Sequence, residues 1–318
     1  MRILLVKTSS LGDVIHNLPV ASDLKRQFPD AVIDWCVEDT FADIPRLHSA
    51  VARVIPVSIR GWRKALFRGA TWREIGAFRQ EIAGGNYTAV LDTQGLIKSG
   101  VIAFFAKGPC HGYAAEVARE PLASWFYDKT FVIPPNAHAV ERNRWLSAAA
   151  FDYPVNLPLD YGIMAPDPGF PWLPEGRRAV LITATSRDDK LWSEDHWIAA
   201  ARYLVERGRR PVLPSGNAVE RQRAGRIAAA VAGSLVAPPL SLRELAALIG
   251  HAELAVGVDT GLIHLAAALG VPTIALYVAS DPALTGVYGT RDFRNLGGPG
   301  HAPTVGEVIA AIDQELRR

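Results

Sequence analysis

The feature of this sequence that most limits its fold is a repeated alternation of short apolar segments with helical patterns. In the first half, apolar segments at Ile3–Val6, Val32–Val37, Val54–Val57 and Ala89–Asp92 predict strands, and a helical pattern over Val14–Phe28 follows the first of them. Strands without polar alternation that are separated by helices are typical of a parallel sheet covered on both faces. The first half therefore predicts an α/β domain with a parallel sheet.

The same alternation restarts after a proline-rich segment. Six prolines occur in the 21 residues from Pro154 to Pro174, a composition that predicts a linker. Beyond it the pattern predicts strands and helices at Ala179–Thr183, Ser193–Arg207, Pro211–Pro214, Leu242–Ile249, Leu254–Val258, Leu262–Leu269, Thr273–Val278 and Thr304–Arg318. Two such halves predict two doubly wound, Rossmann-like parallel-sheet domains that face a central cleft.

Length, charge and cysteine content exclude several classes of protein. A chain of 318 residues has a prior of about two domains, and 49% apolar with 21% charged residues is an ordinary globular composition. The net charge of +2 (34 basic against 32 acidic residues) is too small for a protein that coats a polyanion. Cys36 and Cys110 form no Cys-x-x-Cys pair, which favours buried free thiols in a reducing compartment.

Two apolar segments bear on membrane insertion and secretion. The N-terminal apolar run is four residues long, too short for a signal peptide. The segment Gly261–Ala279 is about as long as a membrane span, but Gly270 and Pro272 interrupt it, which favours a helix followed by a buried strand. The sequence therefore predicts a cytoplasmic chain without a transmembrane segment.

Polar residues follow the first predicted strand, at Lys7–Val14, where open α/β sheets bind ligands. The small hydroxyl residues and glycine of this segment allow a ligand to approach the backbone closely. Asp13 lies where the next helix begins. It has two interpretations: it caps that helix, or its carboxylate takes a proton from a hydroxyl at the mouth of the cleft. The segment lacks Gly-x-Gly-x-x-Gly, which disfavours a nicotinamide-dependent dehydrogenase.

A second polar segment, 184–192, follows the first strand of the second half. Thr185 and Ser186 offer hydroxyl groups, and Lys190 offers a compact positive charge for a phosphate. The pair Asp188–Asp189 has basic residues on both sides and does not have the spacing Asp-x-Asp. A local salt-bridged turn is therefore favoured over a metal site for these two carboxylates.

The most informative segment is Val256–Leu265, where a predicted strand runs through Asp-Thr-Gly into a helix. The free N–H groups at the start of such a helix bind a diphosphate. Aspartic proteases also contain Asp-Thr-Gly, but they need two copies on β-rich halves, and this chain has one copy between a strand and a helix. His264 lies on the apolar helix and is compatible with a core histidine as well as with a ligand-binding one.

Residues 44–73 contain seven basic residues and no acidic one, with Trp62, Leu66, Phe67 and Trp72 among them. A basic and aromatic stretch of this kind suits an anionic membrane surface or an anionic acceptor. The alternative is a solvated helix face whose aromatic residues lie in the core. Nucleic acid is disfavoured because the rest of the chain is balanced in charge and contains no known binding module.

Six segments resemble, in order and spacing, the lipopolysaccharide heptosyltransferases, and the type I enzymes in particular. They extend over nearly the whole chain and are Lys7–His16, Asp92–Ser99, Ala118–Ala123, His138–Arg144, Arg187–Lys190 and Val258–His264. The segment Ile59–Lys64 also looks more like type I than type II. One such motif is weakly specific, whereas six in register are strongly specific.

The resemblance implies a GT-B fold, which we expect to divide into an N-terminal acceptor-binding domain (1–160), a linker (161–177), a C-terminal ADP-sugar-binding domain (178–302) and a helix that crosses back to the first domain (303–318). It implies an inverting, metal-independent glycosyltransferase without a cofactor. The enzyme would move L-glycero-D-manno-heptose from ADP-heptose to the first Kdo sugar of Kdo2-lipid A, in the synthesis of the lipopolysaccharide inner core. The expected partners are these two substrates and the anionic inner-membrane surface, at whose cytoplasmic face the enzyme would lie peripherally.

The resemblance also implies roles for single residues. Asp13 would be the general base. On the donor side, Glu220 would hold the ribose and Asp259 the heptose, and His264 would lie near the phosphates. The diphosphate would be held by Thr185, Ser186, Lys190, Thr260 and Gly261. On the acceptor side, the expected binding residues are Ser10, Gly12, Arg60, Arg63, Lys64, Gln94, Lys98, Arg119 and His138.

The chemistry of the residues agrees with this assignment. An inverting displacement needs one base on the acceptor side and stabilisation of charge on the leaving diphosphate. Without a metal ion, that charge must be met by Lys190, hydroxyl groups and a helix N-terminus, and one well-placed donor is worth about 3 kcal/mol. A lone carboxylate favours direct displacement over a covalent glycosyl intermediate.

Two segments depart from the family pattern, and other functions stay open. Val278–Pro282 stands where the family commonly has a Gly-Pro-Thr-Asp-Pro turn, and Pro214–Asn217 replaces a turn with an aromatic residue, which leaves the adenine contacts open. The alternatives are transfer to a later core sugar, a nucleotide-sugar epimerase of the same fold, and a non-catalytic binding protein. An epimerase would consume the donor without an acceptor, and a binding protein would be indifferent to Asp13→Ala.

Overall fold

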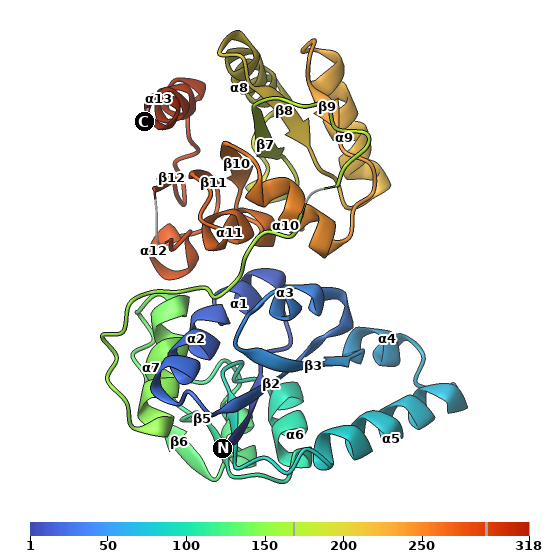
Figure 1. The fold of residues 1–318 in the computed structure, drawn as a ribbon, viewed down its shortest axis with the longest axis vertical. Coiled ribbons are helices and arrows are strands. Elements are labelled where there is room, and N and C mark those ends of the chain that lie inside the picture. The colour runs from blue at the N-terminus through green and yellow to red at the C-terminus, as the bar shows by residue number, and fades with distance from the viewer. Residues whose placement is uncertain (168, 290–291, 318) are drawn as a thin grey trace. The chain divides into compact units, whose positions relative to one another are not determined.

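The computed structural model describes residues 1–167, 169–289 and 292–317. Pro168, Thr290–Arg291 and Arg318 belong to the predicted linker, C-terminal domain and terminal helix and lie outside the described residues. The chain divides into two compact units, Met1–Gly162 (unit 1) and Ile163–Arg318 (unit 2). Each unit has its own six-stranded sheet with helices packed around it (Figure 1).

Unit 1 is a parallel α/β unit whose strand order is β3-β2-β1-β4-β5-β6. Its strands are β1 (Arg2–Val6), β2 (Val32–Glu38), β3 (Val51–Val57), β4 (Ala89–Asp92), β5 (Cys110–Tyr113) and β6 (Lys129–Phe131). Its α-helices are α1 (Leu11–Ile15), α2 (Leu18–Gln27), α3 (Asp43–Arg46), α4 (Ile59–Lys64), α5 (Gly69–Ala83), α6 (Ile97–Phe105) and α7 (Ala139–Phe151), with 3-10 turns η1 (Asp39–Phe41) and η2 (Pro121–Phe126).

The order of the strands in unit 1 places two loops side by side. The chain leaves β1 for β2 on one side and returns to pair β4 on the other side of β1. The carboxyl ends of parallel strands share one edge of the sheet, so the loops that follow β1 and β4 meet at this switch point. Ile3–Val6 of β1 is fully buried, which explains why the strand is apolar on both faces.

Unit 2 repeats this architecture with the order β12-β11-β10-β7-β8-β9, also parallel. Its strands are β7 (Arg178–Ile182), β8 (Arg210–Leu213), β9 (Leu235–Val236), β10 (Leu254–Val258), β11 (Thr273–Tyr277) and β12 (Phe293–Gly297). Its helices are η3 (Asp188–Lys190), α8 (Glu194–Glu206), α9 (Ala218–Ala229), α10 (Leu242–Gly250), α11 (Gly261–Ala268), α12 (Pro282–Thr285) and α13 (Val305–Leu316). Here the switch point lies between β7 and β10.

Most predicted elements are present, and one is wrong in form. The single helix expected over Val14–Phe28 is two helices, α1 and α2, separated by His16–Asn17. Pro19 lies in the first turn of α2, where backbone N–H groups make no hydrogen bond within the helix, so that the missing N–H of proline costs nothing there. Within one continuous helix, Pro19 would have broken the hydrogen-bond pattern. The segment Gly261–Ala279 is helix α11 followed by strand β11, as predicted.

The terminal helix α13 packs on unit 2. Val308, Ala311 and Ile312 are buried in the core that α8 and the sheet of unit 2 form. Thr304 and Glu307 cap its start with reciprocal hydrogen bonds. The crossing of this helix to the first domain stays a prediction. Among the described residues, none of the helices has the length and apolar character that a membrane crossing requires.

Candidate active site

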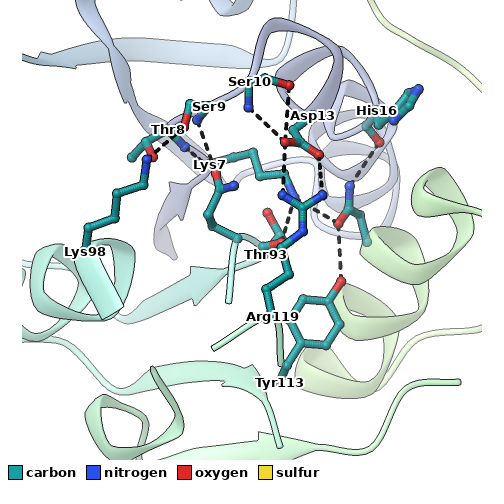
Figure 2. A network of polar contacts seen from close by, with 12 residues as sticks. Lys7, Thr8, Ser9, Ser10, Asp13, His16, Thr93, Lys98, Tyr113 and Arg119 are labelled. Carbon is teal, nitrogen blue, oxygen red and sulfur yellow. Dashed lines mark hydrogen bonds and ion pairs between the residues drawn. The ribbon is translucent and has the colours of Figure 1, made fainter. Parts of the chain in front are cut away.

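The loops after β1 and β4 are joined by one side chain. Gln94, directly after β4, accepts hydrogen bonds through Oε1 from the backbone N–H groups of Thr8 (3.0 Å) and Ser9 (3.2 Å). Lys98, on α6, donates to the Ser9 hydroxyl (2.9 Å). Gln94 thus holds the backbone that leads to Asp13, and Lys98 holds the side chain of Ser9 in the same segment (Figure 2).

The Asp13 carboxylate is fixed from two directions. Its Oδ2 accepts from the backbone N–H of Ser10 (2.8 Å), because Ser10 caps α1 and Asp13 is the third residue of the helix. Both of its oxygens also accept from the guanidinium of Arg119, at 3.1 and 3.2 Å (Figure 2). The N-cap residue of this helix is therefore Ser10 and not Asp13, although the Asp13 carboxylate forms the reciprocal half of the capping box.

A buried lysine lies behind this carboxylate. Lys7 donates through Nζ to the carbonyl of Thr93 (2.7 Å) and to Oδ1 of Asn143 (3.3 Å). Oδ1 of Asn143 also accepts from the hydroxyl of Tyr113 (3.2 Å), and its amide group donates to the carbonyl of His16 (3.2 Å). Figure 2 shows this network reaching from α1 to Tyr113.

The same network encloses a small polar cavity. It has a volume of about 40 Å³ and is lined by Lys7, Asp13, Thr93, Gln94, Tyr113, Val117, Arg119, Ala139, Arg142 and Asn143. The sequence patterns indicate no role for five of these residues, namely Lys7, Thr93, Tyr113, Arg142 and Asn143. One signal was available for Lys7, which follows four fully buried apolar residues and precedes the polar loop. The others come from distant segments with no pattern to connect them.

The charges of this cluster act on one another. Burial lowers the pKa of Lys7 from 10.5 to about 8, against the attraction of Asp13. Burial alone would raise the pKa of Asp13, but the charges of Lys7 and Arg119 and the Ser10 N–H outweigh it and hold that pKa below its ordinary value. Asp13 is therefore an ionised carboxylate with a cation on either side.

Asp92, the last residue of β4, holds the second loop. Its carboxylate accepts from the N–H groups of Gln94 (2.7 Å) and Gly95 (3.3 Å) and from the hydroxyl of Tyr127 (2.7 Å). Burial raises the pKa of Asp92, although these hydrogen bonds oppose the rise. Asp92 thus orients the loop that positions Gln94.

The basic residues of α4 lie beside this network. The charges of Arg60 and Arg63 add to burial in lowering the pKa of Lys98, so that the three cations are within electrostatic reach of one another. The backbone N–H of Arg60 donates to Glu38 (2.8 Å). Lys64 is exposed at the end of α4, so its head group is free to meet an anion in solution.

The remaining acceptor candidates lie at helix starts. Gly12 is in the first turn of α1, next to Asp13. His138 is buried at the N-terminus of α7, where its Nδ1 accepts from the N–H of Val140 (3.2 Å) and its ring meets His16 edge to face at 5.5 Å. His138 therefore has a structural role at the start of α7.

In unit 2, Asp259 is the centre of a second cluster, at the end of β10. Its Oδ2 accepts from Lys190 Nζ (2.5 Å) and from the Ser280 hydroxyl (2.6 Å), and His264 Nε2 is 3.6 Å from Oδ1. The hydroxyl of Thr185 donates to the backbone carbonyl of Asp259 (3.0 Å). The structure therefore brings together four predicted donor-site residues and adds Ser280, which the sequence analysis did not single out.

The electrostatics of this cluster keep Asp259 ionised. Burial alone would raise its pKa, but hydrogen bonds from His264, Lys190 and Ser280 hold the pKa well below the usual range of a carboxyl. His264 thus contacts a charged group, which a purely apolar core position would not provide. Ser280 belongs to the segment that departs from the family pattern, and its hydroxyl gives that loop a defined contact with the cluster.

The other donor candidates lie near this cluster or on a separate turn. Thr260 and Gly261 begin α11, directly after Asp259, and Ser186 is exposed beside Thr185. Glu220 lies apart on α9, where its carboxylate accepts from Gly216 N (2.6 Å) and Asn217 Nδ2 (2.7 Å). Glu220 therefore orders the turn before α9.

Of the acidic pair after β7, Asp189 forms the salt bridge of the predicted turn. The guanidinium of Arg187 donates to both carboxylate oxygens of Asp189, with Nε 3.0 Å from Oδ1. Within the described residues, no group of three or more His, Cys, Asp or Glu side chains is arranged to hold a metal ion.

Comparisons with known proteins identify the family. The sequence model of glycosyltransferase family 9 (heptosyltransferase) matches residues 75–309. Lipopolysaccharide heptosyltransferase 1 of Pseudomonas aeruginosa is 46% identical over 299 residues, which cover 91% of this chain and 82% of that protein. The chain belongs to glycosyltransferase family 9, the heptosyltransferases. It is a glycosyltransferase of lipopolysaccharide biosynthesis, of the heptosyltransferase 1 type.

Solved structures of this family confirm the predicted fold. The Escherichia coli heptosyltransferase WaaC with ADP matches with a TM-score of 0.91 at 41% identity, over 99% of this chain and all of that chain. The same enzyme with ADP-2-deoxy-2-fluoro heptose matches with a TM-score of 0.87 at 41% identity, over all of this chain and 99% of that chain. The heptosyltransferase described here therefore has the GT-B fold that the sequence predicted.

Proposed function

We propose that this heptosyltransferase transfers L-glycero-D-manno-heptose from ADP-heptose to the first Kdo sugar of Kdo2-lipid A, by inverting displacement without a metal ion. The similarity to an E. coli enzyme solved with an ADP-heptose analogue supports the donor. The observation that carries the mechanism is the ionised Asp13 carboxylate, held between Lys7 and Arg119 beside the basic residues of α4. Such a group is suited to act as a base toward an anionic sugar acceptor.

The donor diphosphate binds at the Asp259 cluster. Lys190 uses one N–H for Asp259 and retains two donors for phosphate oxygens. The N-terminus of α11, with Thr260 and Gly261, adds backbone donors and the positive end of a helix dipole. Together these groups stabilise the charge that develops on the leaving ADP.

Further donor contacts follow from the same placement. The hydroxyls of Thr185 and Ser186 face the phosphates together with His264, and Asp259 binds the heptose. Glu220 binds the ribose from the ordered turn before α9. The hydrogen bonds that Glu220 receives from Gly216 and Asn217 leave further lone pairs on its oxygens for a ribose hydroxyl.

The acceptor binds in unit 1. Arg60, Arg63, Lys64 and Lys98 meet its anionic groups, while Ser10, Gly12, Gln94 and His138 shape the surface around Asp13. Kdo is a sugar acid, and the guanidinium of Arg119, half exposed in this structure, can pair with its carboxylate. Arg119 then leaves Asp13, whose oxygens become available to the attacking hydroxyl.

Transfer takes place in one displacement. The acceptor hydroxyl oxygen forms a bond to the anomeric carbon of the heptose, and the bond from that carbon to the diphosphate oxygen breaks. The hydroxyl proton passes to Asp13, and ADP leaves with the bonding electron pair. Attack from the side opposite to the leaving group inverts the anomeric centre, and one carboxylate is sufficient for this chemistry.

We further propose that the enzyme works peripherally at the cytoplasmic face of the inner membrane, where a lipid-anchored acceptor would lie. The basic, aromatic stretch 44–73 supports this location.

The proposed activity is tested by the release of ADP from ADP-heptose, with and without delipidated Kdo2-lipid A. Release that depends on this acceptor is the expected result. Release without an acceptor would contradict the transferase and indicate hydrolysis or the chemistry of an epimerase. Release only with an already heptosylated acceptor would contradict the proposed acceptor and indicate transfer to a later core sugar.

A further inference from the structure

The connection between α4 and α5 presents large apolar side chains to solvent. The side chain of Phe67 is fully exposed, at 106% of its reference area, and Trp72 and Leu66 are 61% and 43% exposed. We call Leu66, Phe67 and Trp72 the apolar tip. An exposed apolar cluster of this kind on a soluble domain is characteristic of an interaction surface.

The apolar tip is held by hydrogen bonds and does not depend on a partner for its shape. The Trp72 indole N–H donates to the carbonyl of Leu66 (2.9 Å), and the Thr71 hydroxyl donates to the carbonyl of Ala65 (2.8 Å). The N–H of Arg68 also donates to the Ala65 carbonyl (3.0 Å). These hydrogen bonds hold the connection between α4 and α5 (Figure 1) in a defined turn, in which the side chain of Phe67 is fully exposed.

The side chains around the apolar tip are cationic. Four exposed bases flank it, namely Arg63, Lys64, Arg68 and Arg73. The carboxylate nearest to the apolar tip along the chain, that of Glu74, accepts a hydrogen bond from the indole N–H of Trp62 (3.0 Å). A protein partner with an apolar groove would not require this excess of positive charge. An anionic bilayer attracts the basic residues and also buries the aromatic side chains in its interface.

We propose that the apolar tip inserts into the headgroup region of an anionic bilayer, with Arg68 and Arg73 bound to lipid phosphates. This inference rests on the proposed function, because a lipid-anchored acceptor requires the enzyme to work at such a surface. Insertion of Phe67 places α4 at the level of the headgroups. Arg60 and Lys64 of α4 then lie where the sugar of a membrane-anchored acceptor emerges.

Binding to vesicles tests the docking step. Wild-type enzyme should bind vesicles that contain phosphatidylglycerol and should not bind pure phosphatidylcholine vesicles, with binding that weakens as salt rises. Phe67→Ser should weaken binding about tenfold, through the loss of apolar contact with the interface. The pair Arg68→Gln and Arg73→Gln should weaken it about 25-fold, because each cation contributes about fivefold.

Trp125 provides a matched control. Its side chain is 81% exposed in the same unit, but its neighbours in the chain include Glu120 and Asp128. Trp125→Ser should bind anionic vesicles as the wild type does. Equal losses in Trp125→Ser and Phe67→Ser, or wild-type binding by Phe67→Ser, would overturn the proposal.

A single label locates the contact directly. Cys36 and Cys110 are buried, so a Phe67→Cys variant carries one accessible thiol for a polarity-sensitive fluorophore. Its emission should shift to the blue with anionic vesicles, while a label on a Trp125→Cys variant should not shift. No shift at position 67 in the presence of bound vesicles would contradict insertion of the apolar tip.

Transfer rates with two forms of the acceptor distinguish a failure of the docking proposal from a failure of the proposed function. Phe67→Ser should retain wild-type kcat/KM with delipidated acceptor and lose about tenfold with the acceptor embedded in vesicles. If the wild type transfers to neither acceptor, the proposed function fails. If the wild type is active and Phe67→Ser equals it on both acceptors, the docking proposal fails alone.

Discussion

Replacing Lys7 should stabilise the protein at neutral pH, although Lys7 is buried in a polar network. Burial penalises the charged ammonium and lowers its pKa from the ordinary 10.5 to about 8 in the folded state. At about 1.4 kcal/mol per unit, keeping Lys7 charged costs the folded state about 3 kcal/mol at pH 7. The wild type tolerates this cost because the ammonium supports the ionised Asp13.

Lys7→Met removes the charge together with two hydrogen bonds, to Thr93 and Asn143. Each lost bond costs about 1 kcal/mol. The expected net gain at pH 7 is therefore about 1 kcal/mol in the free energy of unfolding. Activity should fall in the same variant, because Asp13 loses one of the two cations beside it.

The gain should depend on pH with a definite sign. Because the folded pKa of Lys7 is below the unfolded one, the unfolded chain binds more protons between pH 8 and 10.5. Wild-type stability therefore rises relative to the variant across that window, and the variant becomes the less stable protein by about 2 kcal/mol near pH 10.5.

Urea unfolding of both proteins at pH 7 and pH 10 measures this difference. Lys129→Met, which removes an exposed ammonium, is the control and should show no reversal between the two pH values. If Lys7→Met is destabilised by the same amount at both pH values, burial of the charge is not what sets its stability, and the reasoning is refuted.

Three further outcomes follow from the structure. Arg119→Met removes a cation that holds the pKa of Asp13 down, so that pKa should rise. The acid limb of the pH profile of kcat/KM should then move to higher pH, and an unchanged acid limb would contradict this. Lys190→Met should weaken ADP binding about tenfold or more by calorimetry, and unchanged affinity would show that Lys190 does not bind the diphosphate. Gly112→Ala should destabilise the fold by about 1 to 3 kcal/mol in urea unfolding, because its Cβ would lie 2.3 Å from the Tyr127 ring, which is tied to Asp92; an unchanged midpoint would contradict this packing.

Much of the fold could be predicted because short apolar runs report burial directly. Ala89–Asp92 and Leu254–Val258 have the bounds that the sequence predicted, since both are central strands buried on both faces. The prediction of one helix over Val14–Phe28 was wrong because the apolar periodicity of the sequence continues across the break before Pro19. Short edge strands such as β9 and β12 do not stand out, because their residues are only partly buried.

The sequence indicates the candidate site through residues in segments that directly follow the ends of strands. Asp13 and Asp259 follow β1 and β10, the positions where parallel sheets bind ligands. The pairing of Asp13 with Arg119 joins residues 106 positions apart, and Asn143 meets Lys7 across 136 positions. No local pattern encodes such contacts, which exist only once the fold brings the segment after β5 and helix α7 beside the loop that follows β1.

The role of Asp13 as the general base is decided by the rate of heptose transfer by Asp13→Asn, measured with saturating ADP-heptose and delipidated Kdo2-lipid A. The amide keeps the shape of the side chain and can still accept from the Ser10 N–H, but it cannot take a proton. The value of kcat should fall by about 100-fold to 10,000-fold, as expected for the loss of a general base, while affinity for ADP is unchanged. A kcat within a few-fold of the wild type would contradict the assignment of Asp13 as the base.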